Sequence, residues 1–140
     1  MNYWFLCLPR ADMEQCMAVG TFGLNRKFIL GQVAEGDKVI CCAGRGDWKI
    51  IGYGTASSNY YVDDRKIFLS DGLFPDRFDF TATKLSTAKE LDVKSIIDQL
   101  GFVKDLAYWA VFFRNGIVKM SKLDWDLIGD QIGCTHSRVR

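Results

Sequence analysis

The chain has 140 residues, of which 49% are hydrophobic and 25% are charged, and its formal net charge is +1. This length is typical of one domain, and the composition excludes a generally disordered chain, which would be poor in apolar residues and highly charged. No apolar stretch approaches the ~20 residues of a membrane-spanning helix, and the near-neutral charge excludes long-range attraction to nucleic acids or anionic lipids.

The first part of the chain is predicted to contain strands and one short helix. An apolar, aromatic run over residues 3–8 indicates a buried strand, which Pro9 ends. Apolar residues at helical spacing predict a helix over residues 10–18. Strands are expected over residues 38–43 and 48–57, and the glycines between them are typical of a β-hairpin.

The middle of the chain is predicted to add two strands and a helix. Residues 66–70 favour a short strand. Apolar and polar side chains alternate over residues 77–84, so this strand should have one buried and one exposed face. Apolar spacing predicts a helix over residues 93–100, with Asp92 as its N-cap and Gly101 beyond its end.

The last part of the chain is predicted to form a hairpin and a helix. Residues 108–113 and 117–120 should pair, because the Asn115-Gly116 sequence between them is typical of a tight turn. Ser121 followed by Asp124 resembles a capping box, which predicts the start of a final helix.

These elements together predict a single α+β domain over residues 1–134, with a curved sheet or barrel of about five to six strands and peripheral helices. Strands and helices do not alternate as a parallel α/β sheet requires, which argues against a dinucleotide-binding fold. Residues 135–140 are expected to form a flexible C-terminal tail.

The cysteines are typical of a reducing compartment. They number five, have no C-x-x-C spacing and are accompanied by a single histidine, His136, so we expect no metal site and no cofactor. Cys7, Cys41 and Cys42 lie in apolar runs and should be small buried hydrophobes. The N-terminus carries no secretory signal, which predicts a cytoplasmic protein, or a nuclear one in a eukaryote.

Catalytic motifs are weak in this sequence. A thiol nucleophile from Cys41 or Cys42 would need His136 as its base, but this histidine lies in the expected tail. Asp76 and Asp79 could form a carboxylate pair, yet they follow turn residues and are typical of solvated acids. We therefore expect a protein that is not an enzyme.

Aromatic residues make up 14% of the chain, and several fall in expected loops or hairpin ends. Exposed rings suit the stacking of a nucleobase, which contributes ~1–3 kcal/mol per base, and Asn25 and Ser57 could supply hydrogen bonds to a base edge. The alternative is that the aromatics are divided between the core and a scattered surface. The aromatic residues in expected loops or hairpin ends are Phe22, Trp48, Tyr60, Tyr61 and Phe74.

Several short segments, taken in order, resemble the EVE domains of the PUA-like superfamily, which are relatives of the YTH domains. None is specific alone, but the ordered set covers nearly the whole chain. The matching segments are Asn2-Tyr3-Trp4, Phe22-Gly23-Leu24 with Asn25 and Arg26, Glu35-Gly36-Asp37-Lys38-Val39, Ser57-Ser58-Asn59-Tyr60-Tyr61, Leu73-Phe74-Pro75-Asp76-Arg77, and Phe112-Phe113-Arg114-Asn115-Gly116 with Asp124-Trp125.

The resemblance implies a PUA-like β-barrel with a non-catalytic aromatic pocket. Such a pocket would accept a flipped, modified base of DNA or RNA, such as a modified cytosine. The residues expected in the pocket are Phe22, Gly23, Leu24, Asn25, Trp48, Ser57, Tyr60, Tyr61 and Phe74.

Local basic groups are expected to hold the phosphates of the bound strand. Residues 15–34 and 48–62 contain no acidic side chain, so one face could be locally basic despite the small net charge. Phosphate contacts position a strand without reading its sequence. The expected phosphate-binding residues are Arg26, Lys27, Lys49 and Arg114.

Two other classes of function compete with this hypothesis. A small nucleotide- or nucleobase-processing enzyme would have an acid–base pair inside its cavity. A protein-interaction domain would instead present a flat, exposed apolar patch. The sequence gives no sign of the oligomeric state and none of a membrane partner.

Overall fold

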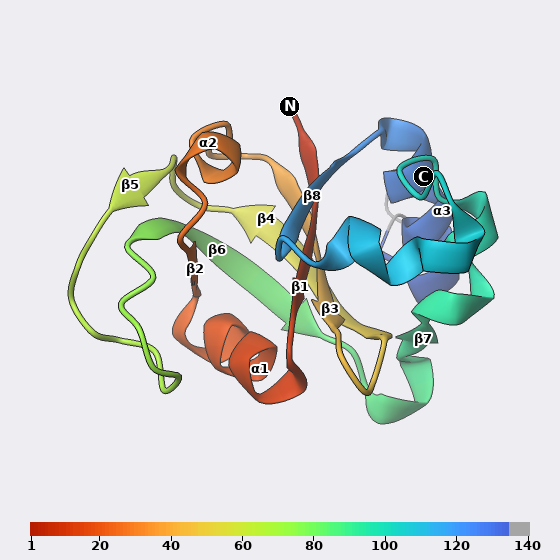
Figure 1. Cartoon of the computed structure of the whole chain (residues 1–140), viewed down its shortest axis with the longest axis horizontal. Coiled ribbons are helices and arrows are strands. Elements are labelled where there is room, and N and C mark those ends of the chain that lie inside the picture. The colour runs from red at the N-terminus through yellow and green to blue at the C-terminus, as the bar shows by residue number, and fades with distance from the viewer. Residues whose placement is uncertain (135–140) are drawn as a thin grey trace.

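Six strands form a curled sheet in the order β2-β6-β4-β3-β1-β8 in the computed structural model, which describes residues 1–134 (Figure 1). The expected tail over residues 135–140 lies outside the described residues. The strands are β1 (Tyr3–Leu8), β2 (Thr21–Leu24), β3 (Lys38–Ala43), β4 (Lys49–Ala56), β5 (Tyr61–Val62), β6 (Asp76–Lys84), β7 (Leu91–Asp92) and β8 (Ile117–Met120).

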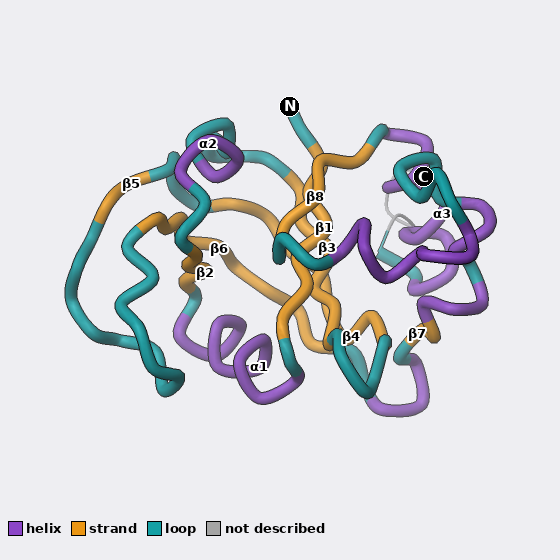
Figure 2. The backbone as a smooth tube through the Cα atoms, in the orientation of Figure 1, coloured by secondary structure: helices purple, strands orange, loops and turns teal. Residues whose placement is uncertain are grey.

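Helical segments lie around the margins of the strands (Figure 2). The expected α+β class, with a barrel-like sheet of about six strands and peripheral helices, is therefore confirmed. Over residues 1–134, none of these helices has the length and apolar character that crossing a membrane requires. The helices are α1 (Arg10–Val19), α2 (Lys27–Leu30) and α3 (Lys122–Ile132), and the 3₁₀ helices are η1 (Thr87–Lys89), η2 (Val93–Ser95), η3 (Ile97–Gln99) and η4 (Leu106–Phe113).

Strand β1 lies inside the sheet and is covered on both faces. It pairs in parallel with β3 and antiparallel with β8. Because side chains alternate along a strand, Trp4 and Leu6 enter one apolar core, while Phe5 and Cys7 enter the core on the other face. Burial on both faces explains why this strand is apolar at nearly every position.

The sheet does not close into a complete barrel. Strands β2 and β8 end the strand order and do not pair with each other within residues 1–134. The two edges approach where a Cβ on Gly116 would lie 3.1 Å from the side chain of Leu24. Gly116 also has a positive φ of 83°, which favours glycine. This glycine lets the two edges approach closely at one point, and the opening beside that point holds the candidate site.

Local sequence signals were confirmed at several element ends. The side chain of Ser121 accepts a hydrogen bond from the backbone N–H of Asp124 at the start of α3. Asp92 likewise caps its helical segment, accepting from the N–H of Lys94. The segment after Asp92 is two short 3₁₀ turns, η2 and η3, rather than one continuous helix over residues 93–100.

Three other element predictions were wrong. Residues 108–113 belong to η4, and β8 pairs with β1 instead of with them, because a short apolar run fits a helix as well as a strand. Residues 66–70 form no strand, since the Lys66 ammonium donates to the carbonyls of Phe68 and Ser70 and holds the segment folded. The segment around Phe22 is strand β2 rather than a loop.

Candidate functional site

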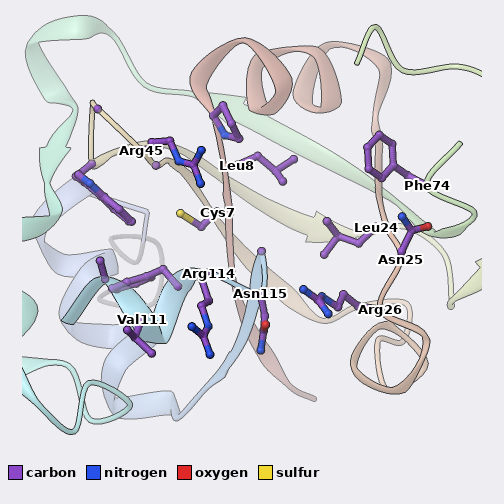
Figure 3. A pocket seen from close by; sticks show the side chains of 17 residues that line it. Cys7, Leu8, Leu24, Asn25, Arg26, Arg45, Phe74, Val111, Arg114 and Asn115 are labelled. Carbon is purple, nitrogen blue, oxygen red and sulfur yellow. The ribbon is translucent and has the colours of Figure 1, made fainter. Parts of the chain in front are cut away.

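A cleft of about 760 Å³ lies at the opening between the two edges of the sheet. Figure 3 shows Leu24, Asn25, Arg26 and Phe74 on one side, Arg45, Val111 and Arg114 on the other, and Cys7 and Leu8 between them. We call it the arginine cleft. Its lining residues are Cys7, Leu8, Pro9, Leu24, Asn25, Arg26, Gly44, Arg45, Gly46, Trp48, Phe74, Ala110, Val111, Phe113, Arg114, Asn115 and Gly116.

The cleft is positively charged. Arg26 follows β2, Arg45 lies in the hairpin between β3 and β4, and Arg114 follows η4, so three separate segments each contribute one exposed guanidinium. The described lining contains no carboxylate, and within residues 1–134 no carboxylate lies within 4.0 Å of these guanidinium groups. The cleft is therefore an anion-attracting site in a molecule with little net charge.

The acid closest to the cleft in the hairpin is engaged elsewhere. Asp47 forms an ion pair with Arg10, in which the Arg10 Nε lies 3.3 Å from the Asp47 Oδ2. Arg10 also donates two hydrogen bonds to the carboxylate of Glu90, at 3.1 and 3.0 Å, and these bonds raise the pKa of Arg10. Asp47 thus pairs with Arg10, and no ion pair joins it to Arg45 among residues 1–134, which leaves the charge of Arg45 available to a ligand.

Trp48 is one of two aromatic residues in the cleft with an unusual backbone. Its φ is 52°, in the left-handed region that a bulky side chain rarely adopts. Its ring packs edge-on against Trp109 at 4.8 Å and lies 5.6 Å from Phe113. This aromatic support fixes a half-buried indole at the wall of the cleft.

Phe74 is the second such residue, with a φ of 47°. Its ring lies 5.9 Å from that of Phe68 and borders the cleft opposite Arg45 (Figure 3). Within residues 1–134, Trp48 and Phe74 are the non-glycine residues with positive φ, and both line the cleft. Backbone strain of this kind costs ~1–3 kcal/mol and is often found at functional sites, so its position makes the cleft the candidate site.

A buried arginine holds the loop that carries Phe74. The guanidinium of Arg77 is fully buried and donates to the carbonyl of Phe74 at 3.0 Å and to that of Leu73 at 2.7 Å. It also donates to the carbonyl of Arg65 and lies 3.6 Å from a carboxylate oxygen of Asp63. Since one charged side chain ties several points of the loop, Phe74 keeps its strained position.

Several residues predicted from the sequence meet in this cleft. Leu24, Asn25, Trp48 and Phe74, all expected around a base, line it. Arg26 and Arg114, both expected to contact phosphate, line it as well. The curling of the sheet brings these residues together from segments far apart in the chain.

Phe22, Tyr60 and Tyr61 do not line the arginine cleft. Phe22 is fully buried and packs 5.6 Å from Phe78 in the core, so its ring offers no exposed wall. The Tyr60 hydroxyl donates to Asp76 at 2.8 Å, and this bond raises the pKa of Tyr60.

The Tyr61 hydroxyl donates to Asp79 at 2.6 Å, and burial together with this bond raises the pKa of Tyr61 to about 12. Of the five aromatic residues expected around a base, Trp48 and Phe74 therefore line the cleft, whereas Phe22, Tyr60 and Tyr61 lie outside it.

The remaining predicted residues also lie outside the arginine cleft. Gly23 faces the ring of Phe68, from which a Cβ would be only 2.7 Å away, so this glycine serves close packing. The backbone N–H of Ser57 donates to the carbonyl of Asp79. The described lining includes neither Lys27 nor Lys49.

Sequence reasoning missed Arg45 and Asn115 as site residues. Arg45 lies between two glycines, and Asn115 lies in an apparent hairpin turn, so both were interpreted through local turn geometry. The available signal was a cation between glycines, a pattern that presents a charged side chain on a tight connection. This pattern indicates a binding residue only once the structure shows that Arg26 and Arg114 line the same cleft.

The lining chemistry supports binding better than proton transfer. No carboxylate or imidazole lies among the described residues of the cleft, so they offer no general acid–base pair. Over residues 1–134, no cluster of three or more potential metal-binding side chains occurs. The arrangement instead combines cations, two amides and half-buried aromatic rings, which suits an anionic ligand with a planar ring.

Comparisons with known proteins establish the fold. No family model matches the sequence. The UPF0310 protein PH1033 of Pyrococcus horikoshii is 25% identical over 143 residues, covering 91% of this chain and 97% of that protein. The structure of Rpa0253 from Rhodopseudomonas palustris has a TM-score of 0.67 at 16% identity, with 96% and 95% of the two chains covered.

YTH domains share this fold. The Mmi1 YTH domain, solved in complex with RNA, has a TM-score of 0.64 at 10% identity, with 98% of this chain and 80% of that chain covered. A further structure, Atu2648 from Agrobacterium tumefaciens, has a TM-score of 0.62 at 13% identity, with 89% and 88% covered. The chain therefore has the fold of a YTH domain.

Proposed function

We propose that this protein is a non-catalytic module that binds DNA or RNA by taking an unstacked nucleobase into the arginine cleft. The observation that carries the proposal is the convergence of three exposed arginines and two backbone-strained aromatics on one acid-free cleft. The RNA complex of the Mmi1 YTH domain, which has the same fold, supports the choice of ligand. As part of the same proposal, the chain is related to the EVE domains that its sequence resembles.

The energetics favour a base that is already unstacked. Flipping a base from a duplex costs a few kcal/mol, whereas stacking on one aromatic ring returns ~1–3 kcal/mol. Stacking on both Trp48 and Phe74 therefore offsets the cost of flipping in part or exceeds it by only a small margin. Arg26 and Arg114, from different segments, can hold phosphates on both sides of the base. The protein should therefore bind single strands more tightly than duplexes.

The finer proposal is that the base carries a modification, such as a methyl or hydroxymethyl group. The apolar side chains of Leu8, Leu24 and Val111 line the cleft and could exclude water from a methyl group. Burying such a group contributes about 0.8 kcal/mol, which corresponds to about a fourfold preference. Modification alone should therefore change affinity only modestly.

Fluorescence anisotropy with labelled oligonucleotides of about eight nucleotides tests the proposal. Single-stranded DNA, single-stranded RNA and duplexes are compared, each with cytosine or modified cytosine at the centre. Trp48→Asn should weaken binding by about 5- to 150-fold, because it removes the ring while asparagine tolerates the left-handed backbone. Tyr60→Phe, outside the cleft, is the control and should leave affinity unchanged. Equal affinities of Trp48→Asn and the native protein would refute the site.

A second candidate, a protein-interaction domain, is favoured by three exposed apolar side chains on η4. Leu106, Tyr108 and Val111 are 54%, 69% and 47% exposed. Exposed apolar patches often bind other proteins. Sedimentation at increasing concentration tests for self-association, which Tyr108→Ser should weaken. A monomer at every concentration, together with tight oligonucleotide binding, would support the nucleic-acid module alone.

A further inference from the structure

We propose that the arginine cleft selects guanine, with Trp48 stacking on the base and Arg45 reading its edge. This inference rests on the proposed nucleic-acid-binding function and names the base that the cleft prefers. It follows from the balance of donors and acceptors in the lining, the geometry of one hairpin, and the placement of the other two arginines.

The polar side chains of the cleft are mainly donors. The guanidinium groups of Arg26, Arg45 and Arg114 carry N–H donors and no acceptor. In the described lining, side-chain oxygen acceptors come only from the amides of Asn25 and Asn115. No carboxylate is present there to accept from an exocyclic amino group. A base edge made of acceptors therefore fits this lining better than one that contains a donor.

Guanine has the edge that this lining requires. Its N7 and O6 are adjacent acceptors that a guanidinium can engage with two parallel hydrogen bonds. Adenine presents an exocyclic amino donor beside its N7 acceptor. An unpaired cytosine has adjacent N3 and O2 acceptors, but its exocyclic amino donor lies on the same edge, and a guanidinium cannot satisfy a donor. Thymine and uracil have carbonyl acceptors but lack the adjacent pair on one edge. A bidentate arginine contact discriminates against the wrong base by about 5- to 150-fold.

Arg45 is positioned for base reading by the hairpin that also carries Trp48. A Cβ on Gly44 would lie 2.7 Å from the sulfur of Cys7, and Gly46 has a φ of 93°, so glycine is favoured on both sides of Arg45. This fixed hairpin directs Arg45 into the cleft (Figure 3). In the proposed arrangement, a base stacked on Trp48 turns its edge toward Arg45, which lies on the same connection and lines the same cleft.

The other two arginines are better placed for phosphate. Arg26 and Arg114 lie on opposite sides of the cleft, flanking Asn115 (Figure 3). A strand that inserts one base against the hairpin would pass between them with its backbone toward their charges. Arg45 therefore contacts the base edge, whereas Arg26 and Arg114 contact phosphates and position the strand.

The test uses thymidine oligomers of about eight nucleotides with one variable central base and anisotropy as the readout. Guanine should bind at least about fivefold more tightly than adenine or cytosine. Inosine, which keeps N7 and O6, should bind like guanine, whereas 7-deazaguanine, which lacks the N7 acceptor, should lose the preference. Arg45→Lys keeps the charge but not the two-pronged contact, so it should abolish the preference while all oligomers still bind. Arg26→Lys is the matched control and should keep the preference.

The outcomes separate this inference from the function on which it rests. Binding of every oligomer without a guanine preference, or a preference for modified cytosine, would overturn guanine selection and leave the nucleic-acid module intact. A guanine preference that survives in Arg45→Lys would overturn the role of Arg45. Failure of every oligomer to bind would overturn both proposals.

Discussion

Replacing Arg26 with glutamine should reduce the salt dependence of nucleic-acid binding by a fixed increment. Arg26 is exposed, lines the cleft and has no carboxylate within 4.0 Å in residues 1–134, so its charge is available to a phosphate. Each neutralised phosphate of a single strand releases condensed counterions and adds about −0.7 to the slope of log affinity against log salt concentration.

The expected size follows from the two positioning arginines. With Arg26 and Arg114 each on one phosphate, the native slope should be about −1.4, so raising salt from about 50 to about 200 mM weakens binding about sevenfold. Arg26→Gln should have a slope of about −0.7 and weaken only about 2.6-fold over the same range. The effect should be equal for all base sequences, because phosphate contacts carry no base information.

The assay is anisotropy titration of one labelled single strand at several salt concentrations. Lys94→Gln is the control, because it removes an exposed charge at η2, outside the cleft lining. Its slope should match that of the native protein. If Arg26→Gln also keeps the native slope, or if its loss of affinity depends on the base, Arg26 does not contact phosphate and the reasoning fails.

Three further predictions concern stability. Gly54→Ala should lower the free energy of unfolding, measured in urea, by about 3 kcal/mol, because the new Cβ would lie 2.1 Å from the carbonyl oxygen of Thr81. An unchanged midpoint of the urea transition would contradict this packing. Asp37→Ala should lower the free energy of unfolding by about 3 kcal/mol, because the N–H groups of Asn2, Trp4 (indole) and Ala34 lose their acceptor. A thermal shift that corresponds to less than about 1 kcal/mol would argue against this role of Asp37.

The hydrogen bond from Arg65 lowers the pKa of Asp63 to about 2, so its stabilisation is complete above the unfolded value near 4 and is lost as pH falls toward 2. Asp63→Asn should flatten the acid limb of a stability–pH curve in this window, and an unaltered limb would refute the contribution.

Local patterns in the sequence were sufficient for much of the fold. The apolar run of β1, the glycine-rich connection to β4 and the Ser121 cap each depend on neighbouring residues, so their chemistry is readable without the partners. Residues 108–113 were mispredicted because their apolar run has no periodicity that separates a strand from a helix.

The candidate site was only partly readable for a different reason. Phe22 and Trp48 are both aromatic and both follow a glycine within a few residues, yet one is fully buried and the other borders the cleft. Which ring faces solvent depends on the packing of the whole sheet. Arg45 was missed because a cation in a turn is ordinary until other cations share its surroundings.

By itself, the sequence determined the kinds of side chain available, the strands that alternation and apolar runs impose, and the turns that glycine and capping residues allow. Only the tertiary structure selected which of these side chains meet. The curled sheet stops short of closure between β2 and β8, and the segments around that opening supply Arg26, Arg114 and Trp48 with its left-handed backbone. Contacts between distant segments depend on how the strands pair and curl, and that information is spread over the whole chain rather than held in any local pattern.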